Sequence, residues 1–343
     1  MGKKNEVGVI VSPAERRMNK LKLLVCIVLF VVIASFLDDL ELLSKPLLEF
    51  VMECRFIQLD YFLKLMGFFG FEFFFLIIPI TCFAISLHNL ERKLSFGFDL
   101  ILLLTYTWLV GSLIKAIFAR DRPYQLFDDI HTPAQMEVLE YSFPSGHSCG
   151  SMICWTFLYD RLKQNKSKNY QVLLYIATWG IVGLASGSRF YFCVHFPHDI
   201  IGEWLLAFIL YRFYSDWHFL SSMATLSGLL VTMIITCFLS TPELLLHMPG
   251  LITCTASLSA IITCAFFYKH LPEFSPLGTA MLPASRWWKT LLRVVIVSLF
   301  FSAVGFSKAQ LTQSIVSLFL TGYFMSLWIL WLAPALLAYL SLY

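Results

Sequence analysis

The chain has 343 residues, of which 58% are hydrophobic and only 14% are charged, and its formal net charge is +3. This balance excludes a soluble globular protein and indicates an integral membrane protein. A net charge this small also gives no reason to expect a nucleic-acid partner.

The beginning of the chain predicts a tail followed by a membrane anchor. Residues 1–20 are polar and basic, which is typical of a solvated cytoplasmic tail. The apolar run from Leu21 to Leu37 has no small-residue cleavage site after it, so we interpret it as a retained anchor and not as a removed signal peptide. From Leu40 to Lys64 charged residues interrupt the apolar ones, which is typical of a helix that lies along the membrane interface.

Further apolar runs predict an all-α, polytopic membrane bundle with about ten spans in total. A helix rises about 1.5 Å per residue, and in lipid every backbone polar group needs a partner within its own segment, so each run is expected to be helical. After the anchor, the expected spans are residues 66–87, 98–118, 148–162, 170–187, 200–214, 219–239, 250–268, 290–306 and 311–332.

The distribution of positive charges predicts the orientation of these spans. Most of the 25 Lys and Arg residues fall in the tail and in the loops that are cytoplasmic if the amino terminus is cytoplasmic. Loops 119–147 and 188–199 then both lie on the non-cytoplasmic side, which is periplasmic or lumenal. The two loops are therefore expected to contribute to one site.

Three polar segments at the borders of these spans have the chemistry of a phosphate site. They are Lys115-(x)6-Arg122-Pro123, Pro144-Ser145-Gly146-His147 and Ser188-Arg189-(x)5-His195-(x)3-Asp199. Hydrolysis of a phosphate ester spreads negative charge over three oxygens, so fixed cations are needed before the reaction. Arg122 and Arg189 offer guanidinium forks and Lys115 a point charge. Backbone N–H groups around Ser145, Gly146 and His147, at the start of a helical run, can also bind an anion.

In this order and spacing, the three segments resemble the signature of the type 2 phosphatidic acid phosphatase (PAP2) superfamily. Its motifs are shared by membrane lipid phosphatases, sphingosine-phosphate phosphatases, glucose-6-phosphatase and vanadium haloperoxidases. The resemblance implies a metal-independent phosphoric monoester hydrolase of the membrane that needs no cofactor and forms a phosphohistidine. It implies His195 as the nucleophile, Asp199 as the group that fixes its tautomer, and His147 as the general acid. Phosphate binding is implied for Lys115, Arg122, Ser145, Gly146 and Arg189.

The resemblance also implies a domain organisation. The family core has six helices, and we expect a PAP2-like catalytic core in residues 66–240. It follows the cytoplasmic tail, 1–20, and a membrane anchor with an interfacial helix, 21–65. Residues 241–343 are expected to form carboxy-terminal membrane helices, as in the longer sphingoid-phosphate phosphatases or glucose-6-phosphatase.

A lipid phosphate is the favoured substrate, because the segments that flank the predicted site are apolar and aromatic. A sugar phosphatase like glucose-6-phosphatase and a lipid phosphotransferase remain alternatives. A non-catalytic transporter or scaffold is disfavoured, because no position of the signature is lost. The bilayer and the lipid phosphate are the expected partners, and the sequence leaves the oligomeric state open.

Overall fold

The computed structural model describes residues 13–68, 94–136 and 140–217, and within these ranges every regular element is helical. The elements are α1 (Pro13–Ser35), α2 (Leu37–Glu53), α3 (Ile57–Phe68), α5 (Leu94–Phe118), α6 (Pro123–Leu126), the 3-10 turn η1 (Ala134–Met136), α7 (Gly146–Leu162), α8 (Lys168–Tyr191) and α9 (Pro197–Trp217). The expected all-α class is confirmed for this part of the chain.

Contacts divide the chain into two compact units. The first comprises residues 1–75 and 110–222, and the second comprises residues 76–109 and 223–343. All residues that the sequence predicts for the site belong to the first unit. The second unit contributes only residues 94–109 of α5 to the described structure.

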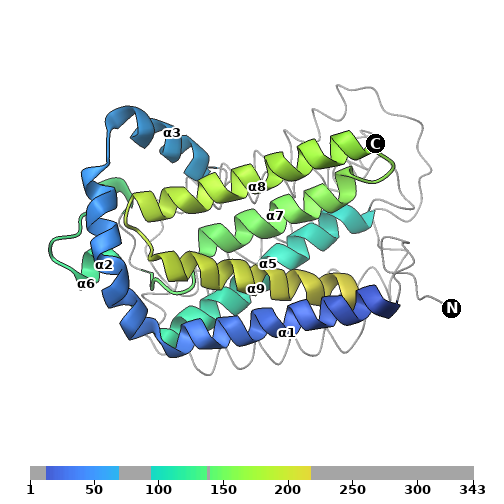
Figure 1. Ribbon diagram of the computed structural model, residues 1–343, viewed down its shortest axis with the longest axis horizontal. Helices are drawn as coiled ribbons and strands as arrows, with labels where there is room; N and C mark the ends of the chain where they lie inside the picture. The colour runs from blue at the N-terminus through green and yellow to red at the C-terminus, as the bar shows by residue number, and fades with distance from the viewer. Residues whose placement is uncertain (1–12, 69–93, 137–139, 218–343) are drawn as a thin grey trace, which may run out of the picture. The chain divides into compact units, whose positions relative to one another are not determined.

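Within the first unit, four long helices run side by side (Figure 1). α1 packs against α9, α9 against α7, α7 against α8, and α8 against α3. Short loops, residues 163–167 and 192–196, join α7 to α8 and α8 to α9, so these helices alternate in direction. As a result, the end of α8 and the beginnings of α7 and α9 meet at one end of the bundle, where α2 lies across them (Figure 1).

The outer surfaces of these helices are apolar. On α1 the side chains of Leu21, Leu24 and Val31 are each more than half exposed, and on α8 Leu173 and Ile176 are exposed. Apolar helix faces of this length are stable against hydrocarbon and not against water. The protein is an integral membrane protein, as expected.

Three helical segments of the described chain are long and apolar enough to cross a membrane: Met18–Ser35, Leu103–Leu126 and Lys168–Tyr191. They correspond to the expected anchor and to the expected spans 98–118 and 170–187. Most of the expected span 66–87, and all of 219–239, 250–268, 290–306 and 311–332, lie outside the described residues. The total of ten spans and the six-helix core therefore stay predictions.

The expected interfacial segment, 40–64, forms two helices. α1 ends at Ser35 and α2 begins at Leu37, after which α3 begins at Ile57. One face of α2 is exposed and apolar, with Leu42, Leu43, Leu47 and Phe50 at helical spacing. The opposite face packs on α8, α1 and α9 and buries Leu48 and Glu41.

Candidate active site

Two loops deliver polar side chains to the end of the bundle where α7 and α9 begin. Residues 119–145 connect α5 to α7, and residues 192–196 connect α8 to α9. Ala119 (φ 45°) and Cys193 (φ 54°) have left-handed backbone, which is uncommon for residues other than glycine and tends to occur at functional sites. The first follows α5 directly, and the second lies two residues before His195, so each turns the chain toward the site.

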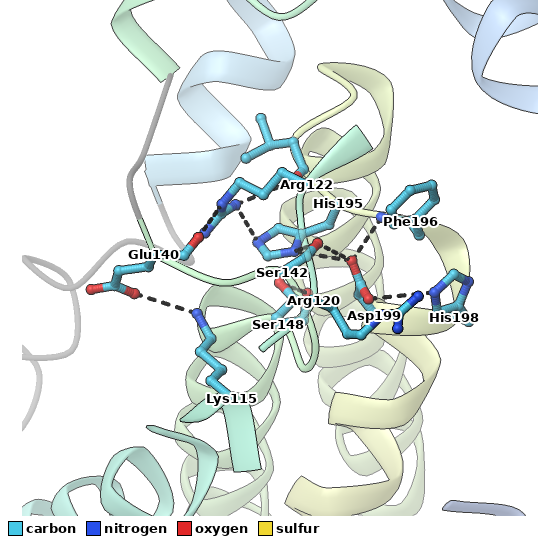
Figure 2. Close-up of polar contacts among 12 residues, drawn as sticks. Lys115, Arg120, Arg122, Glu140, Ser142, Ser148, His195, Phe196, His198 and Asp199 are labelled. Atoms are coloured by element: carbon cyan, nitrogen blue, oxygen red, sulfur yellow. Dashed lines mark hydrogen bonds and ion pairs between the residues drawn. The ribbon is translucent and has the colours of Figure 1, made fainter. Parts of the chain in front are cut away.

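The tautomer of His195 follows from its neighbours (Figure 2). Its Nε2 lies 3.0 Å from Nη1 of Arg122, and its Nδ1 lies 3.3 Å from both Oδ2 of Asp199 and Oγ of Ser142. A guanidinium only donates hydrogen bonds, so Nε2 accepts and the ring proton is on Nδ1. His195 therefore presents the lone pair of Nε2 on the side of Arg122 and is held from behind by Asp199.

The surroundings keep this ring neutral. His195 is 1% exposed, and burial lowers its pKa well below the ordinary value of 6.5. The charges of Arg122, Lys115 and Arg189 lower this pKa further. A neutral imidazole at pH 7 is the form that can act as a nucleophile.

Arg122 is fixed by both loops. It is 3% exposed, its Nε donates to the carbonyl of Glu140 at 2.7 Å, and its Nη1 donates to the carbonyl of Val194 at 3.1 Å. Its backbone N–H donates to Oε1 of Gln125 at 2.9 Å, where Pro123 opens α6. The guanidinium is thereby held in one orientation before any ligand enters.

Two further cations lie in the last turns of helices that end at the site. Lys115 on α5 is 6% exposed and its Nζ lies 3.3 Å from Oε2 of Glu140. Arg189 on α8 is 7% exposed, and among the described residues its Nε has no hydrogen-bond partner. The carbonyl of Arg189 accepts from the backbone N–H of Val194 at 3.0 Å, which ties α8 to the His195 loop. Buried cations of this kind favour an anionic ligand.

The start of α7 completes the arrangement. Ser145 is its N-cap residue, and the Ser145 backbone N–H donates to the carbonyl of Asp199 at 3.4 Å. A Cβ added to Gly146 would meet nothing within 4 Å, so the space beside the first turn is open. Burial lowers the pKa of His147 well below its ordinary value, and the charges of Arg189 and Lys115 lower it further. His147 thus lies in the same positive field as His195.

Comparison with known proteins fits this geometry. Residues 96–223 match the family model described as the PAP2 superfamily. This segment belongs to the PAP2 superfamily. It contains all eight residues predicted for the site, and the expected family and enzyme class, a phosphatase, are confirmed.

A solved structure is also similar to the chain. It is the crystal structure of the first transmembrane PAP2 type phosphatidylglycerolphosphate phosphatase from Bacillus subtilis, with 22% identity and a TM-score of 0.45. The match covers 55% of this chain and 92% of that one. No curated protein matches the sequence significantly.

Three residues of the PAP2 segment that sequence reasoning missed also belong to the site. Glu140 pairs with Lys115, and Ser142, which is fully buried, donates to Oδ2 of Asp199 at 2.5 Å. Glu203 lies one helical turn after Asp199 and is 1% exposed. Glu203 is an ionisable residue within an apolar run, and this signal could have identified it. No spacing rule pointed to Glu140 or Ser142.

Proposed function

We propose that this PAP2 phosphatase hydrolyses phosphate monoesters or diphosphates of lipids, on the non-cytoplasmic face of the membrane, through a phosphohistidine on His195. The single observation that carries the proposal is the environment of the His195 ring. Its Nε2 lone pair lies 3.0 Å from the guanidinium of Arg122, and its Nδ1–H is directed to Asp199. A nucleophile and a phosphate-binding cation are thus already in contact, with a carboxylate that stabilises the charge formed on the ring.

In the first step, Nε2 of His195 attacks phosphorus while the bond from phosphorus to the leaving oxygen breaks. Arg122, Arg189 and Lys115 bind the oxygens on which charge develops. His147 gives its proton to the leaving alkoxide. In the second step, water attacks phosphorus, the N–P bond breaks, and His147 takes the proton from the water. The products are the alcohol and inorganic phosphate, and His195 returns to its neutral form.

His147 must hold a proton when substrate is bound, although its pKa is low in the empty site. An entering phosphate dianion offsets the charges of Arg189 and Lys115, so it raises the pKa of His147. A phosphate that arrives as the monoanion brings the same proton itself. Both routes give the same protonation state of the complex.

The helices beside the site support a lipid substrate. An apolar surface lies near the end of the bundle that carries the site. It is formed by exposed leucines and aromatic residues of α2 and α3, among them Leu43, Phe50 and Tyr61. A substrate with acyl or isoprenyl chains can stay in contact with this surface while its phosphate enters the site.

A substrate panel tests the proposal. The purified full chain would be given phosphatidate, phosphatidylglycerophosphate, an isoprenyl diphosphate, a sphingoid phosphate and glucose 6-phosphate, and released phosphate would be measured beside His195→Ala. We expect turnover of at least one lipid phosphate by the parent, loss of about 10³-fold or more in the variant, and an acid-labile phosphoenzyme in the parent only.

Each other outcome has a definite meaning. Equal turnover by His195→Ala contradicts the phosphohistidine mechanism. Turnover of glucose 6-phosphate alone assigns the site to a sugar phosphatase, and transfer of the labelled phosphoryl group to an added alcohol instead of water assigns it to a phosphotransferase.

A further inference from the structure

A buried ion pair connects α2 to the loop that carries Arg122. Glu41 on α2 is 4% exposed, and Arg120 donates to it through Nε, 2.8 Å from Oε1, and through Nη2, 2.5 Å from Oε2. Arg120 also pairs with Asp38, the more exposed acid one turn earlier. A two-pronged contact of this kind fixes the geometry of both partners.

The backbone of Arg120 continues this connection toward the catalytic histidine. Its carbonyl accepts a hydrogen bond of 2.7 Å from the backbone N–H of Ser142. The hydroxyl of Ser142 donates to Oδ2 of Asp199 and lies 3.3 Å from Nδ1 of His195. A continuous series of contacts therefore connects Glu41, through Arg120 and Ser142, to the His195–Asp199 pair. Figure 2 shows Arg120, Ser142, His195 and Asp199.

We infer that Glu41, through Arg120 and Ser142, is a positioning residue that sets the orientation of the His195 ring. Glu41 lies outside the matched PAP2 segment, residues 96–223. On this inference α2, which precedes that segment, supports the loop that carries Arg120 and Ser142. The inference concerns the same site as the proposed function and rests on it for its kinetic test. Neither Glu41 nor Arg120 touches the reacting atoms, and Ser142 acts through His195 and Asp199.

The chain offers a matched control for the loss of this ion pair. Lys45 on α2 forms a second salt bridge, 2.8 Å long, with Asp129 of the same α5–α7 connection, and Asp129 is about half exposed. Asp129→Asn therefore removes one charge from an ion pair of α2, as Glu41→Gln does, but it breaks no contact in the series that leads to His195.

The kinetic test compares Glu41→Gln, Ser142→Ala and Asp129→Asn with the parent, using a soluble aryl phosphate. We expect kcat to fall about tenfold or more in the first two variants with little change in KM, and to stay near the parent value in Asp129→Asn. The double variant Glu41→Gln/Ser142→Ala is expected to lose no more than the worse single variant, because both changes break one series of contacts. A normal kcat in Glu41→Gln, an equal loss in Asp129→Asn or fully additive losses would overturn the inference.

Two further measurements separate positioning from folding and from the proposed function. The reversed pair Glu41→Arg/Arg120→Glu restores the ion pair and is expected to recover most of the kcat that either single reversal loses. In ¹⁵N-histidine-labelled protein, the Nδ1–H proton of His195, assigned by its absence in His195→Ala, is expected to be protected from exchange in the parent and Asp129→Asn and to exchange faster in Glu41→Gln. This signal needs no turnover, so unchanged protection refutes the positioning role even if the parent proves inactive on every phosphate tested.

Discussion

At the scale of single residues, the site separates two imidazoles that spacing alone treats alike. His195 has a carboxylate, a serine hydroxyl and a guanidinium around its ring, whereas His147 is the second residue of α7, two positions after the N-cap residue Ser145. In the proposed mechanism, the first environment orients the nucleophile and the second holds the general acid that protonates the leaving group. The two histidines should therefore respond differently to the same substitution.

Replacement of His147 should depend on the leaving group. His147→Ala is expected to lower kcat/KM for an alkyl phosphate by about 10²- to 10⁴-fold, because the alkoxide then leaves without a proton. For p-nitrophenyl phosphate, whose leaving group is stable as an anion, the loss should be below about tenfold. Hydrolysis rates of both esters in parent and variant give the measurement, and equal losses for the two esters would rule out the acid role.

The pH dependence should report the lowered pKa of His195. Its folded pKa lies below 6.5 because of burial and the nearby cations, so the neutral, reactive form persists as pH falls through 6.5 and is lost only below that value. The second pKa of a phosphate ester is about 6, so the measured kcat/KM is corrected for this ionisation of the substrate. We expect the corrected kcat/KM to decline only below pH 6.5. An acid limb centred above pH 6.5 would contradict the environment described for this ring.

At the scale of elements, α9 packs closely against the segment that precedes α7. Gly202 of α9 faces Phe143, which is fully buried and stands between Ser142 and Pro144. Phe143 also packs edge-on against Phe118 at the end of α5, with ring centroids 5.5 Å apart. A shift of Phe143 therefore moves Ser142 relative to Asp199.

Gly202→Ala tests this fit. The added Cβ would lie 2.6 Å from Cε2 of Phe143, so the ring must move, and we expect a loss of about 1–3 kcal/mol in stability together with reduced kcat. Gly180→Ala in α8 is the control, since its Cβ would meet nothing within 4 Å and alanine favours the helix by about 0.5–1 kcal/mol. Thermal unfolding and phosphate release measure the two effects, and similar behaviour of both variants would refute the fit.

At the scale of the whole molecule, the site lies at one end of the bundle. Cys54 is the C-cap residue of α2 and is exposed. The next residue, Arg55, donates to the carbonyl of Tyr191 at the end of α8, 3.1 Å away. Cys54 therefore marks the end that carries the site. Residues 163–167, between α7 and α8, mark the other end.

Labelling from the two sides of the membrane tests the proposed orientation. In sealed cells or vesicles, a membrane-impermeant maleimide is expected to label Cys54 from the non-cytoplasmic side, measured against Cys54→Ser. Gln164→Cys in the Cys54→Ser background should be labelled only after the cytoplasmic side is opened. The reverse pattern would place the active site in the cytoplasm.

The eight predicted site residues came from the sequence because they lie in three motif segments that resemble the PAP2 signature. Phosphate chemistry requires cations, imidazoles and a helix start, and these lie next to apolar runs that lipid forces into helices. The helical class and the membrane location follow from the same apolar runs. Only the tertiary structure showed which partners hold these residues in place.

Ser142 and Asp199 are 57 positions apart, and Arg120 and Glu41 are 79 apart. Such hydrogen bonds depend on the paths of two irregular loops. These paths are determined by the left-handed turns at Ala119 and Cys193 and by the packing of Phe143. Local sequence determines which chemical groups a segment carries, because helix formation and charge are local properties. The choice of partner is decided by the packing of distant segments, because a hydrogen bond needs atoms within about 3 Å and no local pattern specifies that distance.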